Sequence, residues 1–384
     1  MTDRAPGRET APAQFRRETG MTSTDAAGGR SPTDHESSVR ERREEAVASF
    51  DEEHKGFVGR LQHALHVTPA LVPLIVVIAA IAVFGLVLGE RFFSAGTLTL
   101  ILQQVQIVGI LAAAQTLIIL TAGIDLSVGA IAVFSSVIMG QFTFRYGIPA
   151  PVSIAIGMAV GTGIGAVSGF LVSRVKLPPF IVTLGMWQIV LAANYLYSAN
   201  ETIRSQDLRA EAPLLQFMGN RVEVGGAIFT FGVISMILLV VILAYALRST
   251  AWGRHVYAVG DDPEAAALAG VNVGRTLMSV YMLAGFICAL AGWVMIGRFG
   301  SVSPSASTGV LGNIQSITAV VIGGISLFGG RGSIVGAFFG ALIVGVFELG
   351  LRMAGADAQW TFLLIGMLII GAVAVDQWIR KVSA

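Results

Sequence analysis

The chain contains three lysines, Lys55, Lys176 and Lys381, that could serve a phosphate-binding loop. None stands in the G-x-x-x-x-G-K-[ST] pattern, whose backbone cradles nucleotide phosphates. The sequence also lacks a His-Glu-x-x-His pair, a cysteine cluster and a Gly-x-Ser-x-Gly elbow, and its one cysteine, Cys288, lies in an apolar run. We therefore expect no catalytic residue, no metal site, no cofactor and no ATPase site of its own.

Two acidic residues in or beside apolar runs are the candidates for proton chemistry. An ionisable group within a membrane span is a functional candidate by default, so Asp125 or Glu348 could be the coupling carboxylate of a secondary transporter. Asp125, however, stands at the expected inner end of a span. There it can cap the next helix, which Leu126 and Ser127 would open, and we favour this structural role. The sequence names no partner for Glu348.

Amide and hydroxyl side chains gather in two of the apolar runs. They can exchange hydrogen bonds with a neutral polyol without trapping it. Equally, they can bond neighbouring helices to one another. Both interpretations stay open, because the polar residues recur on several helix faces. The candidates for a solute pathway are Gln103, Gln104, Gln115 and Thr116 in the earlier run, with Gln106 beside them, and Asn313, Gln315 and Ser316 in the later run.

The connection 251–274 between two apolar runs contains the clearest local signal. Asp262 can cap a helix whose first residue is Pro263, and Glu264 favours the positive N-terminal end of that helix. The alanines that follow are strong helix formers, and Gly270 suits a C-terminal stop. We predict a short helix of about two turns, terminated at both ends.

The composition places these residues in a membrane protein. Hydrophobic residues make up 54% of the 384, charged residues make up 13%, and the mean hydropathy is +0.74. An average soluble domain has about 25% charged residues. We predict an all-α integral membrane protein with about ten transmembrane helices, some broken or re-entrant. The apolar runs lie near 71–89, 98–120, 128–144, 151–173, 178–198, 226–247, 275–297, 309–328, 333–351 and 359–378.

The ends of the chain set its expected orientation. Almost half of the charged residues precede residue 61, and residues 1–60 are predicted to be a disordered tail. Lys and Arg favour the side of the membrane that carries the tail, so we expect both termini in the cytoplasm and a multi-pass transmembrane domain over 61–384. The segment 199–225 would then lie outside. A net charge of +1 offers no basic patch for nucleic acid.

Glycine spacing predicts one helix contact. Gly157, Gly161, Gly165 and Gly169 recur every four residues and form a stripe on one face of the run 151–173. Such a stripe lets two helix backbones approach closely within lipid. We assign it to helix packing.

Two short segments are similar to one another in sequence. Thr121–Gly129 and Gly323–Gly330 each end an inward-going run and precede an outward-going one, as the two copies of a parallel repeat would. Chance similarity in a glycine-rich chain is the alternative.

The predicted short helix resembles the E-A-A-x-x-x-G loop of ABC importer permeases through Glu264-Ala265-Ala266 and Gly270. In that family this helix docks into a cleft of the ATPase subunit and transmits its movement. The alternative is that the helix only connects two spans. Three further segments are similar to ribose- and xylose-type sugar permeases, so the resemblance covers about residues 70–380. These segments are Leu120–Gly129, Gly253–Gly260 and Ala319–Gly330.

The resemblance implies a permease homodimer in the lipid of a bacterial inner membrane, with cytoplasmic ABC ATPase subunits and a periplasmic sugar-binding protein. Lys176–Gln188 and the ending Asp376–Ala384 resemble fructose import permeases of rhizobial type. Fructose is therefore the first expectation, with mannose, ribose or xylose as alternatives. The mixed charges of 199–225 suit docking of the binding protein, or only a solvated connector. An ion-coupled secondary transporter of a small polar solute is the other functional class, and the capped inner helix favours the ABC importer.

Overall fold

The computed structural model describes residues 70–383, except for the side chains at 306, 358, 372 and 375–383. The predicted disordered tail, 1–60, lies outside these residues.

Eight apolar helices in the described range are long enough to span a membrane. Each corresponds to a predicted run, which confirms the all-α membrane fold. Their bounds are α3 (Leu71–Leu88, extended by the turn η1, Gly89–Arg91), α4 (Ala95–Leu120), α5 (Val128–Tyr146), α6 (Ala150–Ser173), α7 (Pro179–Ser198), α9 (Phe231–Ser249), α12 (Val273–Phe299) and α14 (Ile334–Met353).

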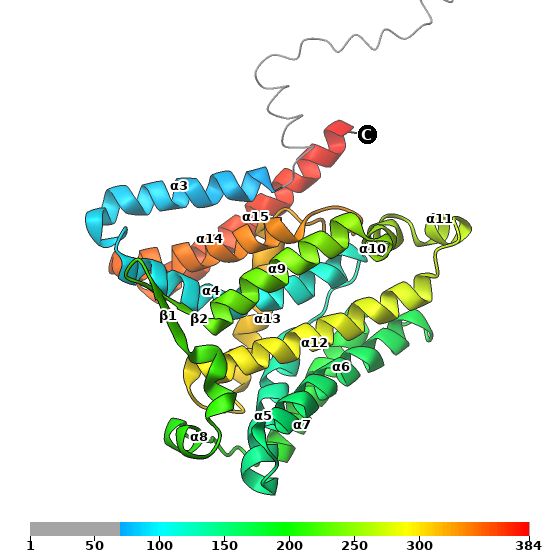
Figure 1. The fold of residues 1–384 in the computed structure, drawn as a ribbon. Coiled ribbons are helices and arrows are strands. Elements are labelled where there is room, and N and C mark those ends of the chain that lie inside the picture. The colour runs from blue at the N-terminus through cyan, green and yellow to red at the C-terminus, as the bar shows by residue number, and fades with distance from the viewer. Residues whose placement is uncertain (1–69, 384) are drawn as a thin grey trace, which may run out of the picture. The chain divides into compact units, whose positions relative to one another are not determined.

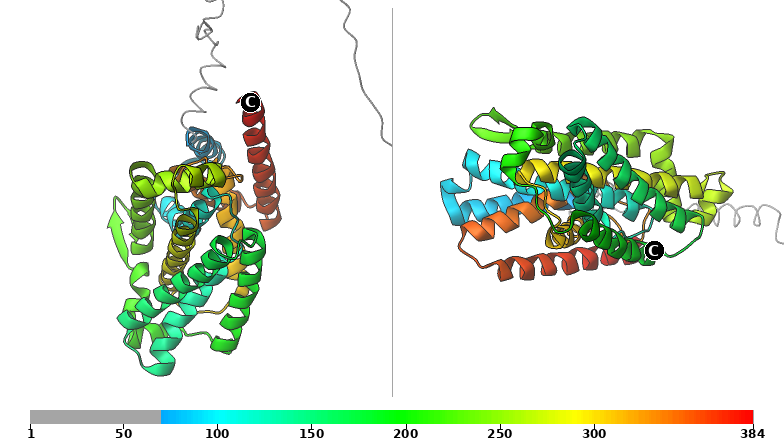
Figure 2. Two further views of the ribbon diagram at one scale, coloured as in Figure 1. Left: turned by 90° about the vertical axis from the view of Figure 1, so that its right-hand side faces the viewer. Right: turned by 90° about the horizontal axis from the view of Figure 1, so that it is seen from below.

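The two remaining runs correspond to α13 (Ala306–Ile322), of 17 residues, and α15 (Ala358–Ser383). In both views of Figure 2, α15 lies at the margin of the helices, and it packs on α13 and α14. Figure 1 shows α10 (Ala251–Asp261) and α11 (Pro263–Leu268) at one end of the long helices. At the opposite end lie α8 (Ser205–Glu211) and the hairpin of β1 (Arg221–Val224) and β2 (Ala227–Thr230).

Helix α13, of 17 residues, lies in a stretch that joins the two ends of the long helices. Val302 before it pairs with Ile203 at the end that carries α8, and Gly330 beyond it lies against Gly260 of α10 at the other end. Near its start, Gly309 lies so close to the beginning of α5 that a Cβ on Gly129 would overlap the Gly309 carbonyl oxygen. Just past its end, Gly323 meets Gly336 in the first turn of α14 in the same way. The segments that precede α5 and α14 are themselves joined by a hydrogen bond from Gly330 N to Leu120 O, of 3.0 Å. The two ends of α13 therefore contact the starts of two different helices, α5 and α14. Of the predicted run 309–328, the part up to Ile322 is helical, and the rest belongs to the loop that precedes α14.

The segment 199–230 is folded. Ile203 and Val302 form an isolated antiparallel bridge, and the Gln216 side chain donates to Gly300 O at 2.8 Å. Both contacts hold the segment to the chain that follows α12. The predicted run 226–247 begins with β2 and becomes helical only at Phe231, where Thr230 caps α9 by accepting from Val233 N.

The glycine stripe of α6 faces α12. A Cβ on Gly165 would overlap the Tyr281 carbonyl oxygen, and one on Gly161 would lie 2.7 Å from the Gly285 carbonyl oxygen. In return, a Cβ on Gly285 would overlap the Gly161 carbonyl oxygen. The two backbones therefore touch directly, as small residues permit between membrane helices.

This contact predicts different effects for two neighbouring glycines. Gly165→Ala should lower the melting temperature of the permease in detergent, because overpacking costs about 1–3 kcal/mol. The matched control is Gly163→Ala, where nothing lies within 4 Å of the added carbon. This control should leave the melting temperature equal or higher, since alanine is the better helix former. Equal melting temperatures for the two variants would contradict the α6–α12 contact.

Candidate coupling surface and polar cluster

The connection between α9 and α12 contains two capped helices. Thr250 caps α10 by accepting from Gly253 N at 3.1 Å. Asp262 Oδ1 accepts from the backbone N–H groups of Glu264 and Ala265 at 2.9 and 3.0 Å, so it caps α11. The chain leaves α11 through Gly270, whose φ of 87° is one that L side chains rarely adopt. The predicted short helix is present, with the predicted cap and stop.

Helix α11 is almost wholly exposed. Ala266 is its one buried residue, at 4%, whereas Leu268 is 91% exposed. Asp261, Asp262 and Glu264 are exposed beside it. Leu268 therefore presents an apolar side chain among carboxylates at the outer face of this helix. The sequence motif located this helix, but it gave no sign that Leu268 points outward.

Helix α10 is held firmly to the ends of the long helices. Gly260 packs so closely that a Cβ there would overlap the Leu120 carbonyl oxygen, the last of α4. Tyr257 donates its hydroxyl to Gly332 O at 2.9 Å, and burial raises the pKa of this phenol above its ordinary value. Trp252 Nε1 donates to Ser279 Oγ of α12 at 2.8 Å. A displacement of α10 would thus act on three elements at once.

The two similar segments, Thr121–Gly129 and Gly323–Gly330, meet beside α10. Leu120 O accepts from Gly330 N, and a Cβ on Gly329 would lie 2.8 Å from Ala122 N. Each segment follows the end of a helix, α4 or α13, and leads into the next one, α5 or α14. Gly260 of α10 lies against both. Helix α10 is therefore packed on the two similar segments, although their origin as a repeat stays a prediction.

Three predicted polar residues brace the segment before α5. Asp125 is 3% exposed, and its Oδ1 accepts from both the N–H and the hydroxyl of Ser127 at 2.6 Å. Burial raises the pKa of its carboxyl, against the lowering effect of these two bonds. The Gln115 amide pairs with the backbone N–H and carbonyl of Asp125 at 3.2 and 3.0 Å. Asn313 donates to Leu126 O and accepts from Gly129 N. Because α5 begins only at Val128, Asp125 shapes the turn ahead of the helix.

Two other predicted pathway residues converge on Glu348. The side-chain amides of Gln104 in α4 and Gln315 in α13 donate to Glu348 Oε2 at 3.1 and 3.3 Å. Arg352 pairs with the other oxygen, Oε1, at 3.0 Å. The carboxylate side chain is 20% exposed and that of Arg352 is 66% exposed, so the cluster lies near the surface of the chain. Here the structure supplies the partners of Glu348 that the sequence did not name.

The remaining candidates differ in their surroundings. Thr116 and Ser316 are fully buried and donate to carbonyl oxygens of their own helices, Ala112 O and Asn313 O. Gln103 is half-buried, and its backbone carbonyl accepts from Arg298 Nε at 3.2 Å. For all seven predicted pathway residues, which also include Gln104, Gln115, Asn313 and Gln315, contact with a solute stays a prediction. Among the described residues, no three potential ligands gather as a metal site would require.

The cluster predicts an asymmetry between its two charged members. Glu348→Leu should cost about 1–3 kcal/mol of stability, because the amides of Gln104 and Gln315 lose their acceptor. Arg352→Leu should cost less than about 1 kcal/mol, since it removes a mostly exposed ion pair. Thermal melts of the purified permease in detergent measure both. A larger loss for Arg352→Leu would contradict the hydrogen bonds from Gln104 and Gln315 to Glu348.

Comparison with known proteins bears on the whole chain. Residues 97–373 match the family described as the branched-chain amino acid transport system / permease component. The chain is 68% identical over 338 residues to the fructose import permease protein FrcC of Rhizobium meliloti, covering 88% of this chain and 93% of the relative.

More distant relatives extend the comparison. The chain is 33% identical to the ribose import permease protein RbsC of Escherichia coli (strain K12), over 80% of this chain and 92% of the relative. It is 32% identical to the galactose/methyl galactoside import permease protein MglC of Haemophilus influenzae, over 67% and 80%. No solved structure matches. With more than half of its length matched by one family, and with apolar helices enough for a multi-pass membrane protein, this chain belongs to the branched-chain amino acid transport system / permease component family.

Proposed function

We propose that this chain is the transmembrane permease subunit of an ABC importer that admits a monosaccharide, fructose foremost, and takes its energy from separate ATPase subunits. The observation that carries the proposal is α11: a capped, exposed helix that directly follows α10, which is packed on the ends of the long helices. A permease without a phosphate-binding loop needs a surface through which a separate ATPase subunit can bind and move it. The identity of 68% to a fructose import permease supports the choice of sugar.

The proposal fixes the two sides of the membrane. In a bacterial inner membrane with both termini inside, α10 and α11 face the cytoplasm, where the ATPase subunits are. The folded segment 199–230 then faces the periplasm. Its exposed charges, among them Glu201, which pairs with Arg145 of α5 at 3.4 Å, offer a docking surface for a sugar-binding protein. Two copies of the permease with two ATPase subunits complete the importer.

Coupling would run from α11 into α10 and then into the membrane. Asp262, Pro263, Glu264, Ala265, Ala266 and Gly270 form and terminate the helix that meets the ATPase. Movement passes through Gly260 to the Leu120 carbonyl and to Gly330. Because these residues end α4 and precede α14, one displacement would act on both sides of α13.

The energy source is tested by reconstituting the chain with its ATPase and binding protein in proteoliposomes. Uptake of radiolabelled fructose should require ATP inside the compartment that α11 faces, and it should persist with a proton ionophore. Uptake that ignores ATP and collapses with the ionophore would instead support an ion-coupled transporter using Asp125 or Glu348.

The coupling helix is tested with Leu268→Gln and Gly270→Pro. The first should leave the melting temperature unchanged, because Leu268 is 91% exposed. The second forces proline into a position with φ 87°, which its ring forbids. Both should lower sugar uptake per ATP hydrolysed at least about tenfold, if docking loses about 1.4 kcal/mol or more. Gly355→Pro in the α14–α15 turn, at φ 79° and with nothing within 4 Å of an added Cβ, is the matched control for backbone strain away from α11. Full uptake in both test variants would contradict coupling through α11.

A further inference from the structure

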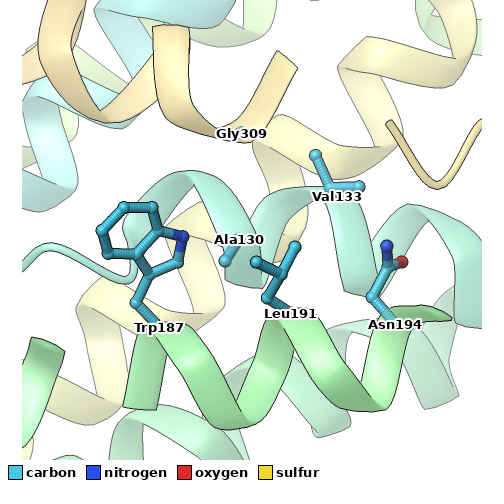
Figure 3. Close-up of a pocket in the computed structure, with 6 residues that line it drawn as sticks. All are labelled: Ala130, Val133, Trp187, Leu191, Asn194 and Gly309. Carbon is cyan, nitrogen blue, oxygen red and sulfur yellow. The ribbon is translucent and has the colours of Figure 1, made fainter. Parts of the chain in front are cut away.

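Helix α7 has one face turned inward and one face uncovered. It packs on α5 and α6, and Figure 3 shows Trp187, Leu191 and Asn194 extending from α7 toward α5 and the start of α13. Asn194 is engaged there, because its Nδ2 donates to Pro304 O at 2.9 Å. The opposite face, called here the outer face of α7, is exposed and consists of Ile181, Gly185, Gln188, Ile189, Ala192 and Leu196.

Gln188 is the residue of the outer face that does not suit contact with lipid. It lies midway along the 20 residues of α7, about 15 Å from either end and so near the middle of a hydrocarbon core about 30 Å thick. Its side chain is exposed, and its amide makes no hydrogen bond within the described residues. An unpaired amide among lipid tails is costly, so this side chain requires a polar partner from outside the chain.

The chain itself limits which partner a second copy could offer. Among the side chains that the structure describes, Gln188 is the one charged, amide or histidine side chain that is exposed more than a turn from both ends of a span. The exposed middle of α9, for comparison, consists of Ile237, Leu238, Val241 and Ile242. The exposed amide that another copy presents at the same depth is therefore its own Gln188. An amide carries both a donor and an acceptor, so two of them can bond each other reciprocally across a two-fold axis.

The residues beside Gln188 allow the close approach that such a pair needs. Gly185 and Ala192 lie one turn before and one turn after it on the outer face. A Cβ on Gly185 would meet nothing within 4 Å, so no contact inside the chain requires a glycine there. Gly161 and Gly165 of α6, by contrast, touch the backbone of α12. Small side chains of this kind let two membrane helices approach closely.

We propose that the outer face of α7 joins two copies of this chain, and that the Gln188 amides of the two copies bond each other there. The proposal rests on the proposed function, which calls for two copies of the permease, and it assigns the surface that holds them together. Gly185 and Ala192 form the close-packed surroundings of the amide pair.

Disulfide trapping tests the geometry in membranes that contain the whole importer. Gln188→Cys should join two copies under a mild oxidant, because residues on a two-fold axis contact themselves and a disulfide requires Cα atoms within about 7 Å. The native Cys288 is fully buried, so it does not compete. Val241→Cys is the control: it lies near the middle of α9, is 59% exposed in the parent, and should yield no cross-linked dimer on a non-reducing gel.

The amide and the small residues are tested by measuring association. Copies of the permease labelled with a donor or an acceptor dye are reconstituted at decreasing density in lipid vesicles, where energy transfer reports the dimer. Gln188→Leu should raise the dissociation constant about threefold or more, because the interhelical hydrogen bonds are lost, and Gln188→Asn should raise it less. Gly185→Leu should also weaken association. Gly163→Leu on the exposed face of α6 should not, although nothing lies within 4 Å of an added Cβ at either glycine.

The possible outcomes separate this surface from the proposed function. Association that Gln188→Leu leaves unchanged, or a Gln188→Cys chain that traps no dimer, would overturn the α7 contact while the parent importer still takes up fructose with ATP. Unchanged association together with a higher fructose concentration for half-maximal uptake would assign Gln188 to the solute pathway and also overturn the contact. A parent chain that takes up no sugar with ATP would refute the proposed function itself.

Discussion

Direct contact between backbones through glycine is the interaction on which the other elements depend. The hydrophobic effect gives helices in lipid little reason to associate, so attraction must come from close packing and from polar contacts. Glycine provides this closeness where α6 meets α12, where α5 and α14 meet α13, and where α10 meets the end of α4. At each of these contacts a single added carbon would overlap a carbonyl oxygen of the neighbouring element.

The last of these contacts joins packing to function. Gly260 lies against Leu120 O, which also accepts a hydrogen bond from Gly330 N. The proposed coupling would use this hydrogen-bonded junction to pass a displacement of α10 on to α4 and to the segment before α14. Helix α11 beyond the junction makes few contacts of its own, which suits an element that another chain must bind.

Four of the predicted pathway residues are engaged with the protein itself. Gln115 and Asn313 are engaged with backbone groups around Asp125, and Gln104 and Gln315 are engaged with Glu348. Each gives up its hydrogen bonds to the protein itself. Among the described residues, the buried Asn194 Oδ1 has no donor.

The sequence by itself determined what local chemistry controls. The apolar runs specified helices, the Asp262 cap and the Gly270 stop specified α11, and the spacing of Gly157 to Gly169 specified a packing face. Each of these depends on residues within one or two helical turns. The tertiary structure decided what depends on distant partners. Gln104 and Glu348 are 244 residues apart, and Asn313 and Leu126 are 187 apart, so no local pattern could pair them. The position of α13 likewise depends on distant residues. Its place is set by where α5 and α14 begin, because backbone contacts at Gly129 and Gly336 hold its two ends.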